Sequence, residues 1–496
     1  MLSSALKYSV MGAAALLVAC GGDSDPAVSQ LPALDAAKAY LAKYDALVAT
    51  SFPATGAAAM ALHDGCYLNH GMTKAYIVND FDTDPKALAS QQYNIGSTRT
   101  NIAVLADRLT KNADGSERRE IDITYDVNFK DGSKNVVGGK ETLISGSSSG
   151  SKLPDGKDCT TAENKPDWRR IGNRQIVETN LTAFNERLER TVLATGAPVS
   201  PSVVYSKYMQ FVVSDPAKVA TYATITGPNL GFDATGKANG TPGTLKLISV
   251  RLLRDAPEMQ GKPGNYVDWR DTDGFRVCQN TARNNHAPAD VADCSKDGGT
   301  SANFGSYNNA SGAQLDMSFA ALNFKAGENY TFKIYNDDGW KTVNGQAAKT
   351  PIATYTATLV NLPLNAADLA GTGVNADKFA RGTSSSKTSG EIASAIRAKT
   401  PISLDLAWSL PGAMPDSRPV ALSYVSGYQS GQANSTGVTW PASRKSDTTY
   451  PVPTATSTSR SFFTPASALV NPTYGEVSLA YTNRNRNLIR SIYTFQ

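Results

Sequence analysis

Short runs in which apolar and polar residues alternate dominate this chain. The clearest is Arg119–Phe129, where apolar side chains occupy every second position from Ile121 onward. Such alternation places the apolar side chains on one face and is typical of a half-buried β-strand. Turns that contain Asp-Gly precede and follow this run, at Asn112–Gly115 and Lys130–Ser133, and a further run returns over Val136–Ile144. Asp-Gly turns between alternating runs predict β-hairpins.

Helical periodicity is confined to a few segments. Between Leu34 and Val48 apolar residues recur at three- and four-residue steps, which gives a helix one apolar face. Asp35 lies in the first turn of this segment, where a negative charge interacts favourably with the helix dipole. Ala57–Leu62 and Glu391–Ala398 predict two further short helices.

Changes in this pattern divide the chain into three parts. Residues 32–195 combine the N-terminal helices with the strand meander and predict an α+β domain. Residues 196–363 contain short strand-like runs, Gln314–Leu322 among them, and predict an antiparallel β-sandwich domain. Residues 364–496 begin with a linker rich in Gly, Ser and Thr and predict a second antiparallel β-sandwich domain. We therefore expect a mainly β, multidomain protein.

Two resemblances make this plan more specific. After its helices and meander, the first part carries Trp-Arg-x-x-Gly-Asn within Trp168–Gln175. In this respect it resembles nuclear transport factor two and SnoaL-like proteins, which implies a cone-like α+β domain whose sheet wraps around a pocket. The two later parts resemble immunoglobulin or fibronectin type III sandwiches, a fold that hosts many unrelated functions.

The candidate pocket residues are polar side chains between the second helix and the first strands. His63, Asp64, Tyr67 and His70 lie within eight positions of one another, and a cone-like pocket can hold a small ligand or a His/Asp pair. The alternative is a polar loop held by Cys66. Metal ligation by His63, Cys66 and His70 is a further interpretation, but their spacing matches no established zinc motif and we expect no metal.

An apolar run near the N-terminus ends at a cysteine. Lys7 precedes the run Met11–Ala19, which has the layout of a secretory signal peptide and is shorter than the roughly 20 residues of a membrane span. Leu-Val-Ala-Cys at residues 17–20 resembles the lipobox of bacterial lipoproteins. The resemblance implies that residues 1–19 are removed and that Cys20 takes a diacylglyceryl group and an amino-terminal acyl chain such as palmitate. Residues 20–31 would then form a flexible tether.

Lipidation at Cys20 implies a compartment. It places the protein in the bacterial cell envelope, and the lack of an acidic residue directly after Cys20 favours the outer membrane. The remaining cysteines then lie in an oxidising space and are expected to form two disulfides. These cysteines are Cys66, Cys159, Cys278 and Cys294. Of the three pairings, their order along the chain favours Cys66–Cys159 and Cys278–Cys294.

Charge and motifs remove several classes of function. The chain carries 48 Lys and Arg against 44 Asp and Glu, so its formal net charge is +4, or +3 once Lys7 is removed with residues 1–19. Nothing in this balance predicts nucleic-acid binding. The sequence contains no nucleophile elbow, Walker loop, dinucleotide fingerprint or His-Glu-x-x-His, and its three histidines leave few bases for a catalytic triad. Asp268, Asp271 and Asp273 lack the order of a calcium loop, and an Asp-Gly turn explains them.

These observations favour a membrane-tethered, non-enzymatic envelope lipoprotein that acts as a binding or scaffold module. Its expected partners are the membrane, through the lipid anchor, and a glycan, a small apolar ligand or another envelope protein. No cofactor and no nucleic acid are expected. The alternative is an envelope enzyme or small-ligand binder whose site lies near His63, Asp64 and His70. The ligand, the membrane leaflet and the oligomeric state stay open at this point.

Overall fold

The computed structural model describes part of the chain. The described residues are 28–84, 87–88, 91, 94–128, 134–233, 238–249, 275–276, 302–337, 350–373, 382–385, 387–398, 402–408, 421–428, 457–462, 474–482 and 487–496. Cys20, the tether as far as residue 27, Cys278, Cys294 and the Asp268–Asp273 segment lie outside them. The described chain consists mainly of β-strands arranged in several antiparallel sheets, which confirms the mainly β prediction.

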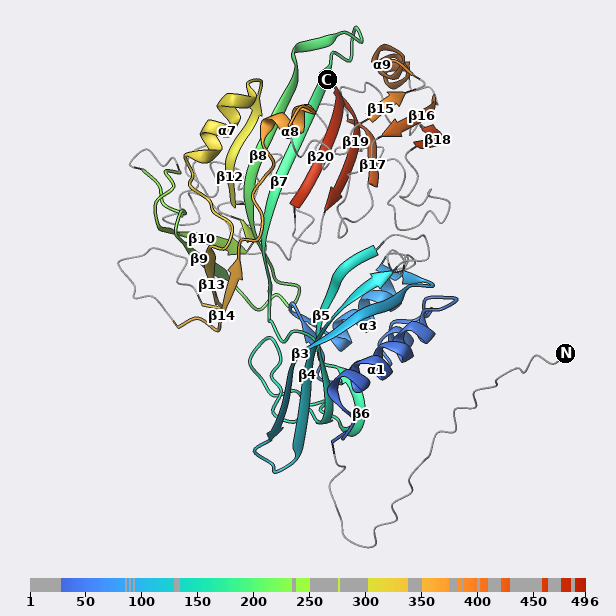
Figure 1. Ribbon diagram of the computed structural model, residues 1–496, viewed down its shortest axis with the longest axis vertical. Helices are drawn as coiled ribbons and strands as arrows, with labels where there is room; N and C mark the ends of the chain where they lie inside the picture. Colours follow the sequence, from blue (N-terminus) through green and yellow to red (C-terminus); the bar gives the residue numbers. More distant parts are fainter. Residues whose placement is uncertain are drawn as a thin grey trace, which may run out of the picture.

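The first module is an antiparallel meander covered by a helix. Its sheet has the order β3-β4-β5-β6, and helix α1 lies across it (Figure 1). The bounds are Thr98–Lys111 for β3, Glu117–Asn128 for β4, Lys134–Ser147 for β5, Asn164–Arg170 for β6 and Ala33–Leu47 for α1. The alternating run expected over residues 119–129 forms β4 as far as Asn128, and the expected turn at Asn112–Gly115 joins β3 to β4. Strands β4 and β5 pair as an antiparallel hairpin, and the turn expected between them at Lys130–Ser133 lies outside the described residues.

The core of this module lies between α1 and one face of the sheet. Ala36, Ala37, Tyr40 and Leu41 of the helix are buried. They belong to one apolar cluster with the inward side chains of the sheet, which are Ile121, Ile123, Tyr125, Val127, Leu143 and Trp168. The apolar face of the helix and the apolar face of the strands thus pack together in a single core.

Short elements connect α1 to the sheet. They are α2 (Gly56–Ala59), the small β1–β2 hairpin (Leu68–Asn69 and Met72–Thr73) and α3 (Lys74–Thr83). Thr55 and Thr73 cap the two helices, because each side-chain oxygen accepts a hydrogen bond from a backbone N–H in the first turn.

A second sheet contains strands from distant parts of the sequence. Its order is β12-β8-β7-β20-β19-β17, and β7 and β20 pair in parallel whereas the other neighbours are antiparallel. The bounds are Glu178–Thr191 for β7, Pro198–Ser214 for β8, Ala302–Asn309 for β12, Ala421–Tyr428 for β17, Tyr474–Thr482 for β19 and Asn487–Phe495 for β20. This sheet and the C-terminus lie at the opposite end of the long axis from α1 (Figure 1).

A third sheet packs against the second. Its order is β11-β10-β9-β13-β14, with bounds Phe275–Arg276, Gly243–Ser249, Tyr222–Gly227, Asn329–Tyr335 and Ala353–Thr358 in that order. One apolar cluster includes Met209 and Phe211 of β8 together with Ile225 of β9 and Phe332 of β13. A hydrophobic core is therefore formed between these two sheets.

The remaining described elements are short. They comprise α7 (Gly312–Ala320), α8 (Ala366–Ala370), α9 (Ser389–Ala398) and a sheet of β15 (Gly382–Ser385), β16 (Ile402–Trp408) and β18 (Ser457–Phe462). The strand expected over Gln314–Leu322 is wrong, because this segment forms α7. Ser311 caps the helix, and Leu315 and Phe319, four residues apart, are buried on one side of it.

Strand pairing does not follow the expected domain limits. The limit at residue 195 falls between β7 and β8, which pair along nearly their whole length. The C-terminal strand β20 then pairs with β7, so residues of all three expected domains contribute to one sheet. The sequence pattern identifies strands but not their partners, and this is why the limits and the pairing differ.

The folded module begins before the expected end of the tether. Val28 is only 3% exposed, and the N–H of Ser29 donates to Oγ of Ser145 at 2.8 Å. A Cβ at Gly146 would lie 2.6 Å from Cγ1 of Val28, so this close approach requires glycine. Residues 28–31, expected as tether, are thus docked on the first module.

Candidate functional site

Strand β6 places two neighbouring arginines on opposite faces of the first sheet. Successive strand residues point to opposite faces. Arg170 is paired with Leu143, whose side chain belongs to the core beneath α1, whereas Arg169 is paired with Ile144. Arg170 therefore faces α1 and Arg169 faces away from it.

Arg170 is the centre of a polar cluster beneath α1. Its Nε donates to Oε2 of Glu141 at 2.6 Å, and its Nη2 donates to Oε1 of the same carboxylate. Its Nη1 lies 3.2 Å from Nε2 of His63, and its guanidinium lies 5.3 Å from the centre of the Tyr44 ring. Burial lowers the pKa of Arg170, but Glu141 and the surrounding tyrosines outweigh burial and hold the pKa well above its ordinary value.

Three buried tyrosines surround this ion pair. The hydroxyl of Tyr125 donates to Glu141, and that of Tyr40 donates to the Leu62 carbonyl oxygen at 3.3 Å. The ring of Tyr67 meets the His63 ring edge to face, with 4.8 Å between the centres. Burial raises the pKa of Tyr67 to about 12 and raises those of Tyr40 and Tyr125 above their ordinary value. All three hydroxyls are therefore protonated at neutral pH.

His63 is a buried, neutral histidine. Burial lowers its pKa well below the ordinary value, and the positive charges of Arg170 and Lys74 lower it further. Because Arg170 can only donate, Nε2 of His63 accepts, and the proton of the neutral ring is on Nδ1. Nδ1 is buried and forms no hydrogen bond of ordinary geometry, although the Met60 carbonyl favours the protonated ring.

The cluster continues towards the start of β3 through a second arginine. Arg99 donates to Oδ1 of Asp45 through Nη1 at 2.8 Å, and its guanidinium lies 4.5 Å from the centre of the Tyr44 ring. Tyr44 therefore contacts both Arg99 and Arg170. Contact between a guanidinium and an aromatic ring is favourable, and more so where water is excluded.

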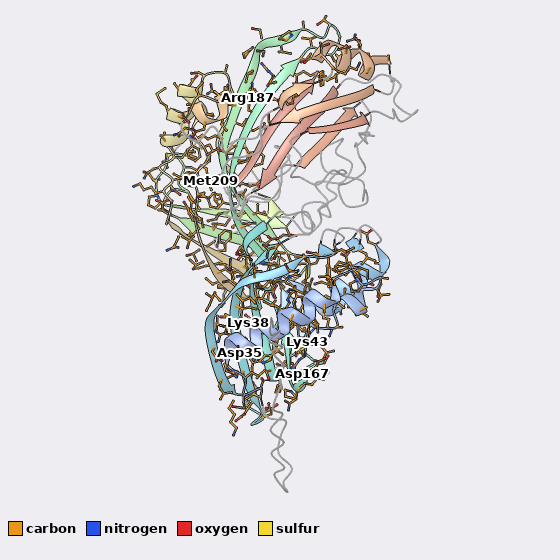
Figure 2. The ribbon with its side chains drawn as sticks, turned by 45° about the vertical axis from the view of Figure 1, so that its right-hand side comes forward. Asp35, Lys38, Lys43, Asp167, Arg187 and Met209 are labelled. Carbon is orange, nitrogen blue, oxygen red and sulfur yellow. A yellow bond between two sulfur atoms is a disulfide. The ribbon has the colours of Figure 1, made fainter. Side chains whose placement is uncertain are left out.

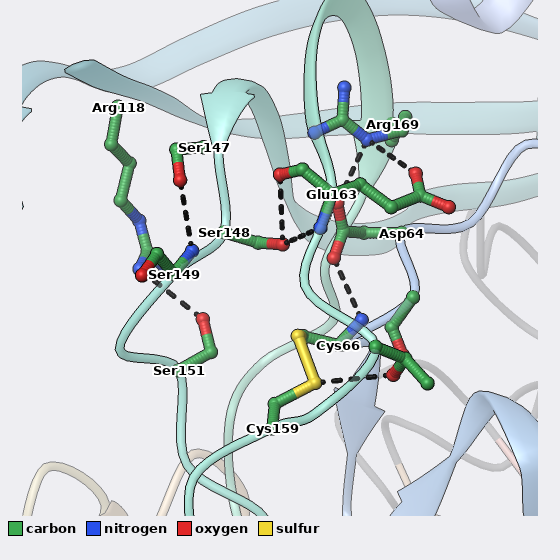
Figure 3. Close-up of a disulfide and its surroundings, with 12 residues drawn as sticks. Asp64, Cys66, Arg118, Ser147, Ser148, Ser149, Ser151, Cys159, Glu163 and Arg169 are labelled. Atoms are coloured by element: carbon green, nitrogen blue, oxygen red, sulfur yellow. Dashed lines mark hydrogen bonds and ion pairs between the residues drawn. A yellow bond between two sulfur atoms is a disulfide. The ribbon is translucent and has the colours of Figure 1, made fainter. Parts of the chain in front are cut away.

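Asp64 belongs to a different network, on the other face of the sheet. Its Oδ2 accepts from Nε of Arg169 at 2.8 Å, and its Oδ1 accepts from the backbone N–H of Cys66 at 2.7 Å. Arg169 also lies 3.1 Å from Glu163 (Figure 3), and its Nη2 donates to the carbonyl of Gly146 at 2.8 Å. Each polar group of this buried pair is thus satisfied internally.

A disulfide closes the loop next to this pair. It joins Cys66 to Cys159, the pairing that their order along the chain favours, and Figure 3 shows it beside Asp64. The Cys66 sulfur is therefore not available as a thiolate ligand. Within the described residues, no group of three or more His, Cys, Asp or Glu is arranged to hold a metal ion.

His70 lies at the connection between the first and second sheets. Its backbone N–H donates to Oδ1 of Asn173 at 3.1 Å, and its ring lies within 3.1 Å of the Asn173 amide nitrogen. The neighbouring Gly71, at φ +83°, donates its N–H to the Gln175 carbonyl at 2.8 Å. A Cβ at Gly71 would lie 2.6 Å from the Ile176 carbonyl oxygen, so the β1–β2 turn fits closely against the segment that leads into β7.

The candidate pocket residues therefore occupy three separate settings. His63 and Tyr67 belong to the Arg170 cluster, Asp64 pairs with Arg169, and His70 contacts the connection to β7. No His/Asp pair forms among these described residues. Arg170 and Glu141, the centre of the cluster, were not predicted from the sequence. The sequence carried only a weak signal for them. Each is a charged residue on a strand, at a position that shares the alternation of the apolar core residues.

The chain was compared with family models, with curated proteins and with solved structures. No family model, no curated protein and no solved structure matched this chain.

Proposed function

We propose that this chain is a lipid-anchored protein of the bacterial cell envelope, held at the membrane, with outer-membrane placement favoured, and acting as a binding or scaffold module. Leu-Val-Ala-Cys at residues 17–20 supports the anchor. The observation that carries the proposal is that Val28, eight residues after Cys20, is buried on the first module. The position of the anchor and the start of the folded module are consistent with one short tether.

The contacts that the buried carboxylates make support a binding or scaffold role rather than catalysis. Asp64 is bound to Arg169 and to the Cys66 amide, and Glu141 is bound to Arg170 and Tyr125. Both carboxylates are therefore engaged in stabilising contacts. Among the described helices, none is long and apolar enough to cross a bilayer.

The finer domain types are part of the same proposal. The helix-covered meander of the first module supports a cone-like domain similar to nuclear transport factor two and SnoaL-like proteins. The apolar core between the second and third sheets supports an antiparallel sandwich of the immunoglobulin or fibronectin type III kind. A glycan or another envelope protein is the proposed partner of the sheets distant from the tether.

Mass spectrometry of full-length protein extracted from its native membrane tests the anchor. We expect a mass that begins at Cys20 and includes the acyl groups, and we expect no free thiol. The Cys20→Ala variant should leave the membrane fraction. An unacylated mass that retains residues 1–19 would overturn the proposal.

A small-ligand binder is the second candidate, and one observation favours it. The Nδ1–H of His63 is buried beside an arginine and forms no hydrogen bond of ordinary geometry. Such a donor costs about 1 to 3 kcal/mol unless it is paired, and a carboxylate with an apolar chain would pair it. Thermal shifts with short-chain fatty acids test this role. Stabilisation of the parent protein that is lost in His63→Phe supports it, and no stabilisation of the parent contradicts it.

A further inference from the structure

Exposed leucines gather on the first module. Eight large apolar side chains of the described residues are exposed, and four of them are Leu31, Leu34, Leu105 and Leu109, around the start of α1 and along β3. Isolated apolar residues are common on protein surfaces, but groups of them mark sites of interaction. Leu31, Leu34 and Leu109 are 48%, 39% and 62% exposed, and we call these three the leucine surface.

Arg119 holds this surface together. Its Nη1 donates to the carbonyl oxygens of Ser29 at 2.7 Å and Leu31 at 2.8 Å. Leu109 is the cross-strand partner of Arg119, so their side chains lie on the same face of the sheet. Arg119 therefore links the chain that leaves the tether to the strand that carries Leu109.

Further contacts hold the side chain of Arg119 in place. Its guanidinium binds Asp107 through two hydrogen bonds of 2.9 and 2.7 Å and lies 5.6 Å from the centre of the Trp168 ring. Through Arg119, the segment before α1 that carries Leu31 is thus bound to β4 and to the Asp107 side chain of β3. Figure 2 shows Asp35 and Lys38 on α1. Asp35 follows Leu34 directly, and Lys38 follows it by four residues, about one helical turn.

The length of the tether limits where this surface can lie. Eight peptide units separate Cys20 from Val28, and fully extended they span at most roughly 29 Å. Leu31 follows Val28 by three residues, and Leu34 follows by six. A lipid on Cys20 would therefore keep the leucine surface within reach of the bilayer at all times.

We propose that the leucine surface docks on the lipid bilayer that holds Cys20, with Leu31, Leu34 and Leu109 in the headgroup and acyl boundary. This inference rests on the lipid anchor proposed above. The acyl chains on Cys20 would hold the protein at the membrane through a tether that leaves its orientation free, and a second apolar contact fixes that orientation. The docked surface orients the first module, and the sheets at the other end of the long axis point away from the membrane (Figure 1).

Quenching of introduced tryptophans by brominated lipids tests the docking. Full-length protein carrying Leu109→Trp or Leu34→Trp is placed on phosphatidylethanolamine and phosphatidylglycerol vesicles that contain brominated phosphatidylcholine. Met317→Trp is the matched control, because Met317 is 67% exposed but lies on α7, outside the first module. We expect quenching above the parent protein in the first two variants and none above the parent in Met317→Trp.

The other outcomes separate this inference from the anchor. Protein that floats with the vesicles while both leucine variants stay unquenched overturns the docking and leaves the anchor intact. Equal quenching of all three variants overturns it as well, since no face is then preferred. A blue shift of the leucine variants with rising concentration in solution, without vesicles, assigns the surface to a second copy of the chain. Failure of the parent protein to float overturns the anchor and, with it, the docking.

Discussion

Arg169 and Arg170 are adjacent in sequence, yet their guanidinium groups bind different carboxylates on opposite faces of β6. Arg169 binds Asp64 at 2.8 Å, and Arg170 binds Glu141 at 2.6 Å beneath α1. The alternation of a strand produces this separation. Its consequence is that His63 and Asp64, also adjacent, are drawn into different networks.

Removing one partner of the Arg170–Glu141 pair should destabilise the protein more than removing both partners. Both side chains are only 16% exposed, so Glu141→Leu leaves a buried positive charge without its partner and is expected to cost about 3 kcal/mol. The double variant Arg170→Met/Glu141→Leu should recover most of that loss. Urea unfolding of the parent, single and double variants measures the difference.

An exposed ion pair provides the control for that series. Lys43 and Asp167 lie 3.9 Å apart with side chains 57% and 77% exposed (Figure 2), so Lys43→Met should change the free energy of unfolding by no more than about 0.5 kcal/mol. A Glu141→Leu effect as small as that of Lys43→Met would contradict the buried-pair interpretation.

His63 should make stability depend on pH. Its pKa is lowered well below 6.5 in the folded protein, so below pH 6.5 the unfolded chain binds a proton that the folded chain does not. Stability from the neutral ring is therefore complete above pH 6.5 and decreases as the pH falls towards the folded-state pKa, by up to about 1.4 kcal/mol for each pH unit. Urea midpoints between pH 7.5 and 5.5 measure this slope.

Two histidine variants distinguish the source of that slope. His63→Gln keeps an acceptor for Arg170 but cannot be protonated in this range, so we expect a flatter dependence on pH. His70→Asn leaves the buried ring in place and should retain the slope of the parent protein. The same slope in His63→Gln and in the parent protein would show that another group is responsible.

The Cys66–Cys159 disulfide should stabilise the first module. It closes a loop with a sequence separation of 93 residues, and the chain-entropy model assigns about 4 to 5 kcal/mol to a loop of that size. The double variant Cys66→Ser/Cys159→Ser should therefore unfold at a lower urea concentration, followed by circular dichroism. An unchanged midpoint would mean that the reduced, unfolded chain keeps the loop ends close.

Residues 196–363 should not fold as an independent domain. Without β7, this fragment lacks the partner of β8 and the core side chains Val177, Leu181 and Ala183; burying a side chain of Val or Leu size contributes about 1.5 to 3 kcal/mol. We expect no cooperative thermal transition for it, whereas a fragment of residues 172–496 contains every described strand of both sheets. Cooperative unfolding of 196–363 alone would contradict this expectation and support the domain limits predicted from the sequence.

Local patterns in the sequence were sufficient for many elements and insufficient for others. The alternation over residues 119–129 produced β4 with Ile121 and Ile123 inward, as expected. Gln314–Leu322 was misassigned because a short apolar segment is compatible with both periods. The N-cap hydrogen bond at Ser311 favours the helix.

The sequence by itself determined the first helix and the strands of the meander, such as β4, because these depend on residues close together in the chain. Only the tertiary structure decided that β20 pairs in parallel with β7, some 300 residues earlier, and that Arg170, Glu141 and His63 share one cluster. Contacts between distant residues depend on which faces and edges are brought together in folding. A periodic pattern specifies the face of each element but not the element against which it packs.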